Sequence, residues 1–356
     1  MCFHRFPNDD KQQPTPVALL DPILAQVSHD CEHAIPSDAD CKFASLVASA
    51  MSGTFADEES RMKQFWKLLE GEFNVSFHRA KYGRCESGGS FIHLGGLLAN
   101  LEVKNEIDSG GGAVHVQNAA YAAAHAFQAD KVRRISVCQT LLIEPAGPNM
   151  SLSGAVFTNI AICDQLSPMV SLLWQSRSRL MLQAAQCFAV MRKAFSSLRT
   201  FYEALDLEAL EHQAPKRQLE YPYSTSFIGP QGIAVQLHYK DKISSTCFKA
   251  TTNSSEGFVF VKFCKSYSRD AHTCLASSGH APRFLGIERL TDQWLMVIME
   301  YVAGCSWDDA ADKPIANLQA AVNLLHDADL VHGDLRPNNV LVESNTVHII
   351  DFELGW

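Results

Sequence analysis

The sequence predicts two domains, an N-terminal α/β domain and a C-terminal α+β domain. The first observation is length, because 356 residues correspond to about two domains of ~150 residues each. The second is the order helix, strand, strand, helix, strand, strand over residues 57–162, which is typical of one α/β domain. The third is a polar, proline-broken stretch at residues 206–227, which predicts a linker. The second domain then covers residues 228–356.

Composition predicts a core-forming soluble protein. Apolar residues make up 47% of the chain and charged residues 19%, below the usual ~25%. Asp and Glu total 39 against 30 Lys and Arg, a net charge of −9, which argues against a generally basic surface for nucleic acid or anionic membrane, although a local basic groove stays possible. No run of ~18 apolar residues exists, so no membrane partner is expected.

The lack of a secretory signal and the cysteine pattern predict an intracellular protein of the cytoplasm or nucleus. The first ten residues lack the long apolar core of a secretory signal. The 11 cysteines include no C-x-x-C pair, which favours reduced thiols over a zinc site.

The N-terminal elements follow from hydrophobic periodicity. Residues 1–50 predict a partly disordered arm, because a polar stretch is followed by weak apolar segments. The N-terminal α/β domain covers residues 57–205, which end in a long helix at 171–205 with an apolar stripe at 3.6-residue spacing. The other expected elements are a helix at 57–73, strands at 91–94 and 97–104, an Ala-rich helix at 115–128, and strands at 136–143 and 155–162.

The C-terminal domain contains three chemical groups at set spacing. Asp334 precedes Asn339 by five residues, and Asp351 follows in the run Ile349–Glu353. Two short strands between Asn339 and Asp351, separated by Ser344-Asn345, predict a hairpin that returns Asn339 to the side of Asp351. Phosphoryl transfer needs a carboxylate that orients the attacking hydroxyl and oxygen ligands for Mg²⁺, and these residue types supply both.

These residues resemble the catalytic loop and metal motif of the protein-kinase superfamily. The resemblance implies Asp334 as the catalytic base, Arg336 as a cation near the transferred phosphate, and Asn339 and Asp351 as Mg²⁺ ligands. Upstream, Gly257–Phe263 resembles the strand whose lysine, here Lys262, pairs with the ATP phosphates. Trp294–Gly304 resembles the strand and hinge that bind adenine, which implies backbone contacts at Glu300 and Val302. ATP and Mg²⁺ are the implied cofactors, and the implied partners are a nucleotide and a protein substrate.

The small-lobe residues and the run His332–Asn339 look more narrowly like the kinase-like proteins of higher fungi and the kinase-bearing Crinkler-type effectors. The pattern departs from kinases in several places. No glycine-rich loop stands between Lys240 and Ala250, and Asp270 is the best acidic candidate for the helix glutamate that pairs with Lys262. Glu353 replaces the usual glycine of the metal motif, which removes its freedom to adopt φ > 0.

The chain also stops at Trp356, so the kinase-like lobe is expected to be truncated. Three outcomes stay open for this domain: working phosphotransfer, nucleotide binding without turnover as a pseudokinase, and a non-functional remnant.

A second constellation lies in the N-terminal domain. Glu102 and Lys104 alternate with apolar residues, so both fall on one face of a strand. A carboxylate beside a cation on such a face can hold Mg²⁺ and stabilise charge on a phosphate. An exposed charged pair without catalytic function explains the same pattern.

With the glycines and Gln117 downstream, this stretch looks like a PD-(D/E)xK nuclease core of the restriction-endonuclease type. That resemblance implies Glu86 as a second acid, and Glu58 or Glu59 as a further ligand. The alternative function is therefore a Mg²⁺-dependent nuclease, with nucleic acid as its partner and the kinase-like segment as a regulatory module.

Overall fold

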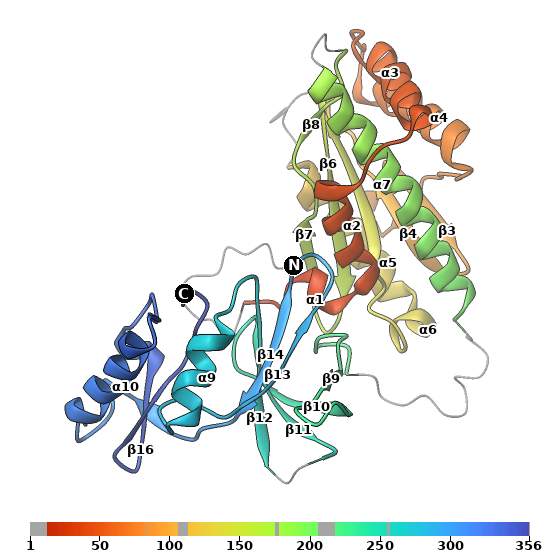
Figure 1. The fold of residues 1–356 in the computed structure, drawn as a ribbon. Helices are drawn as coiled ribbons and strands as arrows, with labels where there is room; N and C mark the ends of the chain where they lie inside the picture. The colour runs from red at the N-terminus through yellow and green to blue at the C-terminus, as the bar shows by residue number, and fades with distance from the viewer. Residues whose placement is uncertain are drawn as a thin grey trace. The chain divides into compact units, whose positions relative to one another are not determined.

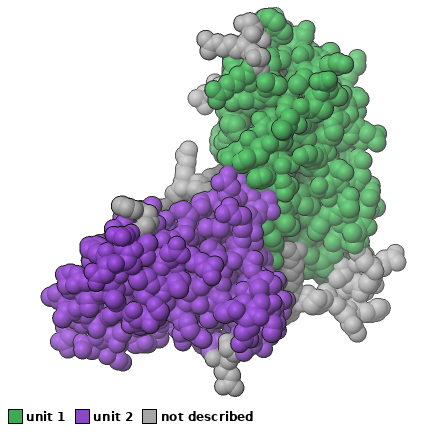
Figure 2. All heavy atoms as spheres, viewed as in Figure 1, with its two compact units in different colours: residues 1–8, 13–223 green, residues 9–12, 224–356 purple. Residues whose placement is uncertain are grey.

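The computed structural model describes residues 13–83, 85–105, 113–174, 178–205, 218–254 and 257–355. Over these residues the chain divides into two compact units between Tyr223 and Ser224 (Figure 2). This division falls inside the range 206–227 that the sequence analysis assigns to a linker, of which residues 206–217 lie outside the described part. Each unit is taken by itself below.

The N-terminal unit opens with four helices, labelled in Figure 1: α1 (Val17–Leu20), α2 (Pro22–His33), α3 (Asp38–Met51) and α4 (Glu58–Phe73). Side chains cap three of them at the start. Asp21 accepts a hydrogen bond from Leu24 N, Ser37 forms a capping box with Asp40, and Asp57 accepts from Ser60 N. The expectation of a partly disordered arm is wrong for residues 17–50, because the apolar sides of α1–α3 are buried in the core.

A five-stranded path forms the sheet of this unit, in the order β3 (Gly89–His93), β4 (Gly96–Leu101), β5 (Thr140–Ala146), β6 (Asn149–Phe157) and β7 (Ala161–Gln165). β8 (Val170–Ser171) pairs with β6, and β1 (Lys81–Tyr82) pairs with β2 (Cys85–Glu86). The β4–β5 pair is parallel and the neighbours are antiparallel. A parallel pair needs a crossover, which α5 (Val114–Gln128) and α6 (Asp130–Arg133) provide.

Helices cover both faces of this sheet. Leu141 and Ile143 of β5 pack in a core that includes residues of α2, α3, α4 and α7 (Ser178–Glu203), whereas Leu142 packs with Ala119 and Ala122 of α5. The N-terminal unit is therefore a mixed α/β structure. The strand expected at 155–162 is wrong, because it runs across the turn between β6 and β7, and the strand expected at 136–143 begins four residues later.

The C-terminal unit begins with a six-stranded antiparallel sheet in the order β13-β14-β12-β11-β10-β9. Its strands are β9 (Ser226–Ile228), β10 (Ala234–Lys242), β11 (Cys247–Thr252), β12 (Phe258–Cys264), β13 (Phe284–Arg289) and β14 (Leu295–Glu300). One helix, α9 (Arg269–Ser277), lies in the chain between β12 and β13. The central position of β12, between β11 and β14, puts Lys262 in the middle of the sheet.

The rest of this unit is small. It comprises α10 (Ile315–Asp327), a single 3₁₀ turn η1 (Pro337–Asn339), and a three-stranded sheet of β15 (Cys305–Ser306), β16 (Val340–Glu343) and β17 (Thr346–Ile349). A shared core joins α9, α10, β16 and β17 around Phe352. The hairpin expected after Asn339 is present as β16 and β17, with Val340 opposite Ile349.

In the described ranges, no helix has both the length and the apolar character needed to cross a membrane.

Candidate active site

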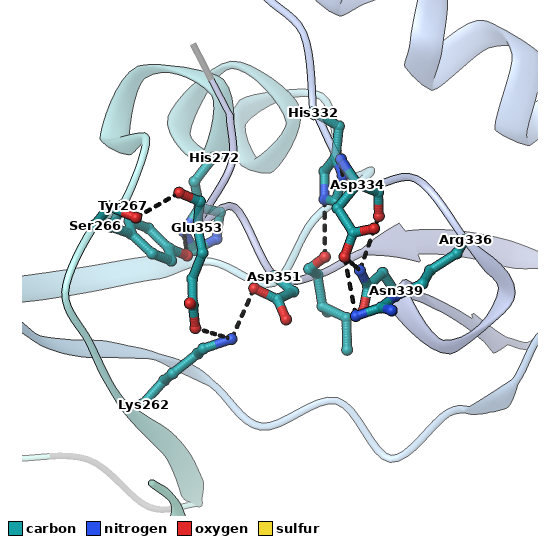
Figure 3. A network of polar contacts seen from close by, with 11 residues as sticks. Lys262, Ser266, Tyr267, His272, His332, Asp334, Arg336, Asn339, Asp351 and Glu353 are labelled. Carbon is teal, nitrogen blue, oxygen red and sulfur yellow. Dashed lines mark hydrogen bonds and ion pairs between the residues drawn. The ribbon is translucent and has the colours of Figure 1, made fainter.

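The loop after α10 gathers three of the predicted site residues. Asn339 Nδ2 donates to Asp334 Oδ2 at 3.0 Å and to the Asp334 carbonyl at 2.8 Å. Arg336 lies 3.0 Å from the same carboxylate oxygen, while its own side chain is largely exposed. The amide thereby orients the Asp334 carboxylate, and the guanidinium places a positive charge beside it (Figure 3).

Buried His332 ties this loop to the strand that leads to Asp351. Its Nε2–H donates to the Ile350 carbonyl at 2.9 Å, and its Nδ1 accepts from Asp334 N at 3.3 Å. Burial disfavours the charged ring and lowers the pKa of His332 despite these polar neighbours. A neutral ring is what this pair of hydrogen bonds requires, since one nitrogen donates and the other accepts.

The β16–β17 hairpin brings the two ends of the motif together. Ile350 N donates a hydrogen bond to the Asn339 carbonyl at 2.9 Å. Asp351 is the next residue in the chain, so the hairpin brings its backbone close to that of Asn339. Asp351 has a φ of 70°, a left-handed conformation that few residues other than glycine adopt. Kinases usually have a glycine at the position of Glu353, and glycine can adopt a positive φ. In this chain the residue with positive φ is Asp351, two residues earlier.

Lys262 reaches the metal motif from β12. Its ammonium lies 2.7 Å from Asp351 Oδ1 and 2.7 Å from Glu353 Oε1, and its side chain is only 10% exposed. In Figure 3 both carboxylates point at Lys262 Nζ. Burial alone would lower the pKa of Lys262, but the hydrogen bonds to the two carboxylates outweigh it and raise that pKa.

The expected pairing of Lys262 with Asp270 is wrong. Asp270 is exposed in the first turn of α9, and the carboxylates on Lys262 come from Asp351 and Glu353. Sequence reasoning treated Glu353 only as the loss of a glycine and missed it as a partner. The available signal was that α9 contains no glutamate, while Glu353 lies two residues from Asp351.

Aromatic rings pack behind the metal motif. Phe352 is fully buried, and the ring of His272 from α9 stacks on it with centroids 4.8 Å apart. His272 Nε2–H donates to the Pro282 carbonyl, and its Nδ1 accepts from the Tyr267 hydroxyl, each at 2.7 Å. Burial lowers the pKa of His272 to about 4, so a neutral ring holds Phe352 in place.

The predicted adenine-binding residues lie at the end of β14. Glu300 is the last residue of the strand; its N–H donates to the Arg283 carbonyl and its side chain is exposed. Tyr301 N donates to the Phe258 carbonyl, and Val302 follows in an irregular segment. The adenine contacts expected at Glu300 and Val302 stay a prediction.

A tight turn between β10 and β11 stands where kinases have a glycine-rich loop. Ile243 N and Ser244 N both donate to the Cys247 carbonyl, and Ser244 Oγ accepts from Thr246 N. Cys247 is paired with Lys262 across the two strands. The turn therefore lies close to Lys262 along the sheet, and its residues 243–246 include no glycine.

The residues present fit a Mg²⁺ ion that is completed by phosphate. Within the described part of the chain, no group of three or more His, Cys, Asp or Glu side chains forms a metal cluster. Mg²⁺ in phosphotransfer sites uses one or two protein oxygens together with phosphate and water oxygens. The Asp351 carboxylate and the Asn339 amide oxygen match that smaller requirement.

The second constellation gathers in the N-terminal unit at the parallel strand pair. Glu102 N donates to the Ile143 carbonyl, which also accepts from Asn118 of α5, and Glu102 Oε2 accepts from Gly88 N at 3.1 Å. Burial raises the pKa of Glu102, although the Gly88 hydrogen bond and nearby Lys104 oppose the shift.

Lys104 and Glu58 lie near enough to Glu102 to act on its charge, whereas no contact joins Glu86 or Gln117 to it among the described residues. Lys104 is nearly buried, 3.5 Å from Glu58 of α4. Glu86 is exposed, and its carboxylate lies 3.8 Å from Arg79, which also contacts Glu59. Gln117 is in the first turn of α5, one residue before Asn118.

A comparison with protein families gives a match within the C-terminal unit. A model of the RIO domain, an atypical protein kinase family, matches residues 291–353, which contain Asp334, Asn339 and Asp351. Among solved structures, the Cydia pomonella granulovirus kinase PK-1 is 19% identical over 34% of this chain and 52% of its own, with a TM-score of 0.30. Vaccinia related kinase 3 is 15% identical over 38% of this chain and 52% of its own, with a TM-score of 0.28.

The chain thus spans about half the length of these two kinases. A search of curated proteins gives no significant match. The family match shows a resemblance of residues 291–353 to the RIO domain. None of the comparisons supports the fungal-type or Crinkler-type resemblance, or the nuclease-like resemblance of the N-terminal unit.

Proposed function

We propose that the C-terminal unit binds ATP with Mg²⁺ and transfers the terminal phosphoryl group to a hydroxyl acceptor, as kinase-like proteins do. The observation that carries the proposal is the 2.7 Å contact between Lys262 and Asp351. It joins a cation from the middle of one sheet to an acid that follows a separate hairpin. A phosphate-binding lysine beside a metal-binding carboxylate is what nucleotide phosphates require.

Each site residue has a role in this proposal. Asp334, oriented by Asn339 and beside Arg336, accepts or orients the proton of the acceptor hydroxyl. Asn339 and Asp351 would hold Mg²⁺, which when bound supplies positive charge to the phosphate oxygens. Lys262 binds the α- and β-phosphates, and the backbone at Glu300 and Val302 binds adenine. A protein hydroxyl is the proposed acceptor.

Ligand-dependent thermal unfolding tests the binding step. ATP at 100 times its Kd stabilises the folded state by ~2.7 kcal/mol, which raises the midpoint by a readily measured amount. We expect a Mg²⁺-dependent rise in the full-length protein that Lys262→Ala and Asp351→Asn each abolish. A chain that shows no rise with ATP and Mg²⁺ would not be a nucleotide-binding protein.

Turnover is tested separately with Asp334→Asn. If the proposal holds, this variant keeps the ATP-dependent midpoint rise but loses transfer of labelled phosphate to protein. Binding without any transfer by the natural sequence would identify a pseudokinase, the second of the three outcomes set out above.

The N-terminal unit supports a second candidate function, Mg²⁺-dependent cleavage of nucleic acid. The observation that favours it is the placement of half-buried Glu102 beside Lys104 and near Glu58. In that reading Glu102, with Glu86 or Glu58, would hold the metal, and Lys104 and Gln117 would orient water at the phosphate. Lys104→Ala should then abolish cleavage and leave ATP binding intact, whereas Asp334→Asn should leave cleavage intact. Cleavage that survives Lys104→Ala would eliminate this site.

A further inference from the structure

We infer that Glu353 is the positioning residue of Lys262, and that it takes the role usually filled by a glutamate on the helix after the lysine strand. The inference rests on the proposed function, because the purpose of holding Lys262 is to present it to nucleotide phosphates. The observation that carries it is the 2.7 Å contact between Glu353 Oε1 and Lys262 Nζ.

The segment that follows the strand of Lys262 holds the backbone around Glu353. Ser266 Oγ donates to the Glu353 carbonyl at 2.7 Å, and Ser268 N donates to the Phe352 carbonyl at 2.8 Å. Ser266 and Ser268 come just after β12, the strand of Lys262. Two hydrogen bonds that do not involve the ion pair therefore hold the backbone from which the Glu353 side chain reaches Lys262.

α9 cannot provide the carboxylate. The buried residues of this nine-residue helix are Ala271, His272 and Leu275, and its one acid, Asp270, is exposed. The helix instead contributes the His272 ring that stacks on Phe352. Because Phe352 directly precedes Glu353, α9 supports the carboxylate through packing and the metal motif supplies it.

A second carboxylate on Lys262 has a chemical reason. Asp351 also contacts Lys262, but Asp351 is the proposed Mg²⁺ ligand, so its charge is shared between the lysine and the metal. Glu353 gives Lys262 a partner of its own. The ammonium then keeps its position when the Asp351 carboxylate serves the metal.

The test compares ATP with adenosine in full-length protein. Lys262 meets phosphates and not the nucleoside, so Glu353→Gln should weaken ATP binding about tenfold, both with Mg²⁺ and in EDTA, and leave adenosine affinity unchanged. Glu353→Asp should recover part of the ATP affinity. Glu343→Gln is the matched control, an exposed glutamate of β16, and should change neither affinity.

Several outcomes would overturn the inference. Loss of adenosine and ATP binding together would show that Glu353 supports the whole nucleotide site and not the position of Lys262 in particular. A loss confined to Mg²⁺-containing samples would make Glu353 a metal ligand. Weaker ATP binding in Asp270→Asn with Glu353→Gln unchanged would return the role to α9.

A double-mutant cycle on thermal unfolding separates this inference from the proposed function. The midpoint changes of Lys262→Met and Glu353→Gln should be non-additive, whereas those of Lys262→Met and Asp270→Asn should add. Additive changes for the first pair would refute the pairing whether or not ATP binds. If the natural sequence binds neither ATP nor adenosine, the proposed function and the phosphate role of Glu353 both fail, while a coupled cycle still establishes the pairing.

Discussion

At the scale of single residues, Gly333 is the position where the candidate site depends most on a missing side chain. It precedes Asp334, has a φ of 77°, and a Cβ added to it would collide with the Leu354 carbonyl. The loop can therefore bring Asp334 close to the metal motif only with glycine at this point.

Replacing Gly333 by alanine should lower the free energy of unfolding by ~2–4 kcal/mol, because the left-handed conformation and the collision both cost energy. Gly279 is a matched control, since its φ is also 77° but an added Cβ meets nothing within 4 Å. Gly279→Ala should cost only ~1 kcal/mol. Denaturant unfolding of both variants checks the difference, and equal losses would contradict the collision.

At the scale of elements, α9 makes the stability of the C-terminal unit sensitive to acid through His272. Its folded-state pKa of about 4 lies below the ordinary 6.5, because burial disfavours the imidazolium. As pH falls below ~6.5 the unfolded chain takes up this proton, while the folded chain resists until about 4. Stability is therefore complete above ~6.5 and declines between these two values.

Through His272, the free energy of unfolding should fall by ~2–3 kcal/mol between pH 7.5 and pH 4.5. His272→Phe keeps a ring against Phe352 and removes the titration, so its loss over the same range should be smaller by about that amount. His326→Gln alters an exposed histidine of α10 and should behave like the natural sequence. Denaturation curves at the two pH values measure the three losses, and an unchanged loss in His272→Phe would assign the acid sensitivity elsewhere.

The central strand β5 of the N-terminal unit has the opposite pH dependence. Glu144 is almost fully buried, and burial raises its pKa to about 7, although Ser153 and Ser151 donate hydrogen bonds to it. Between ~4.5 and 7 the unfolded chain has lost this proton and the folded chain has kept it, so stability falls as pH rises.

Glu144→Gln keeps a neutral group of the same shape at every pH. Through this residue, the free energy of unfolding of the natural sequence should fall by on the order of 3 kcal/mol between pH 4.5 and pH 8. That of the variant should fall much less. Denaturant unfolding at both pH values, followed by a probe in the N-terminal unit, gives the comparison. A variant as pH-sensitive as the natural sequence would show that Glu144 ionises freely in the fold.

At the scale of the whole molecule, each of the two units has apolar cores of its own among the described residues. One core joins α1–α4 and α7 to the β3–β7 sheet, and others within the C-terminal unit surround Phe352 and Val297. Stability changes in one unit should therefore be independent of those in the other.

Hydrogen exchange measured by mass spectrometry tests this independence. Exchange rates are compared after division by the intrinsic amide rate at each pH. On that basis, protection of β5 and β6 should fall when the pH rises from 5 to 8, and protection of α9 and β13 should fall when the pH is lowered to 4.5. ATP with Mg²⁺ should protect peptides of the C-terminal unit alone. Protection that extended through the N-terminal sheet would mean that the two units unfold as one.

The amino-acid sequence by itself determined the residues of the kinase-like motif and several of the strands and helices. Asp334, Asn339 and Asp351 lie within 18 residues, and the hairpin between them follows from local strand and turn preferences. Such short-range signals depend on spacing and side-chain type, which a sequence displays directly. The same reasoning identified Lys262 on its strand.

Only the tertiary structure decided which residues these side chains contact. Glu353 and Asp270 are both acids, and the choice between them as partner of Lys262 depends on how the segment after β12 holds the metal motif. Helices α1–α3 likewise look weak as isolated segments and exist because α7 and the sheet bury their apolar sides. Partners far apart in the chain are selected by packing of the whole unit, and that information is not present in any local stretch.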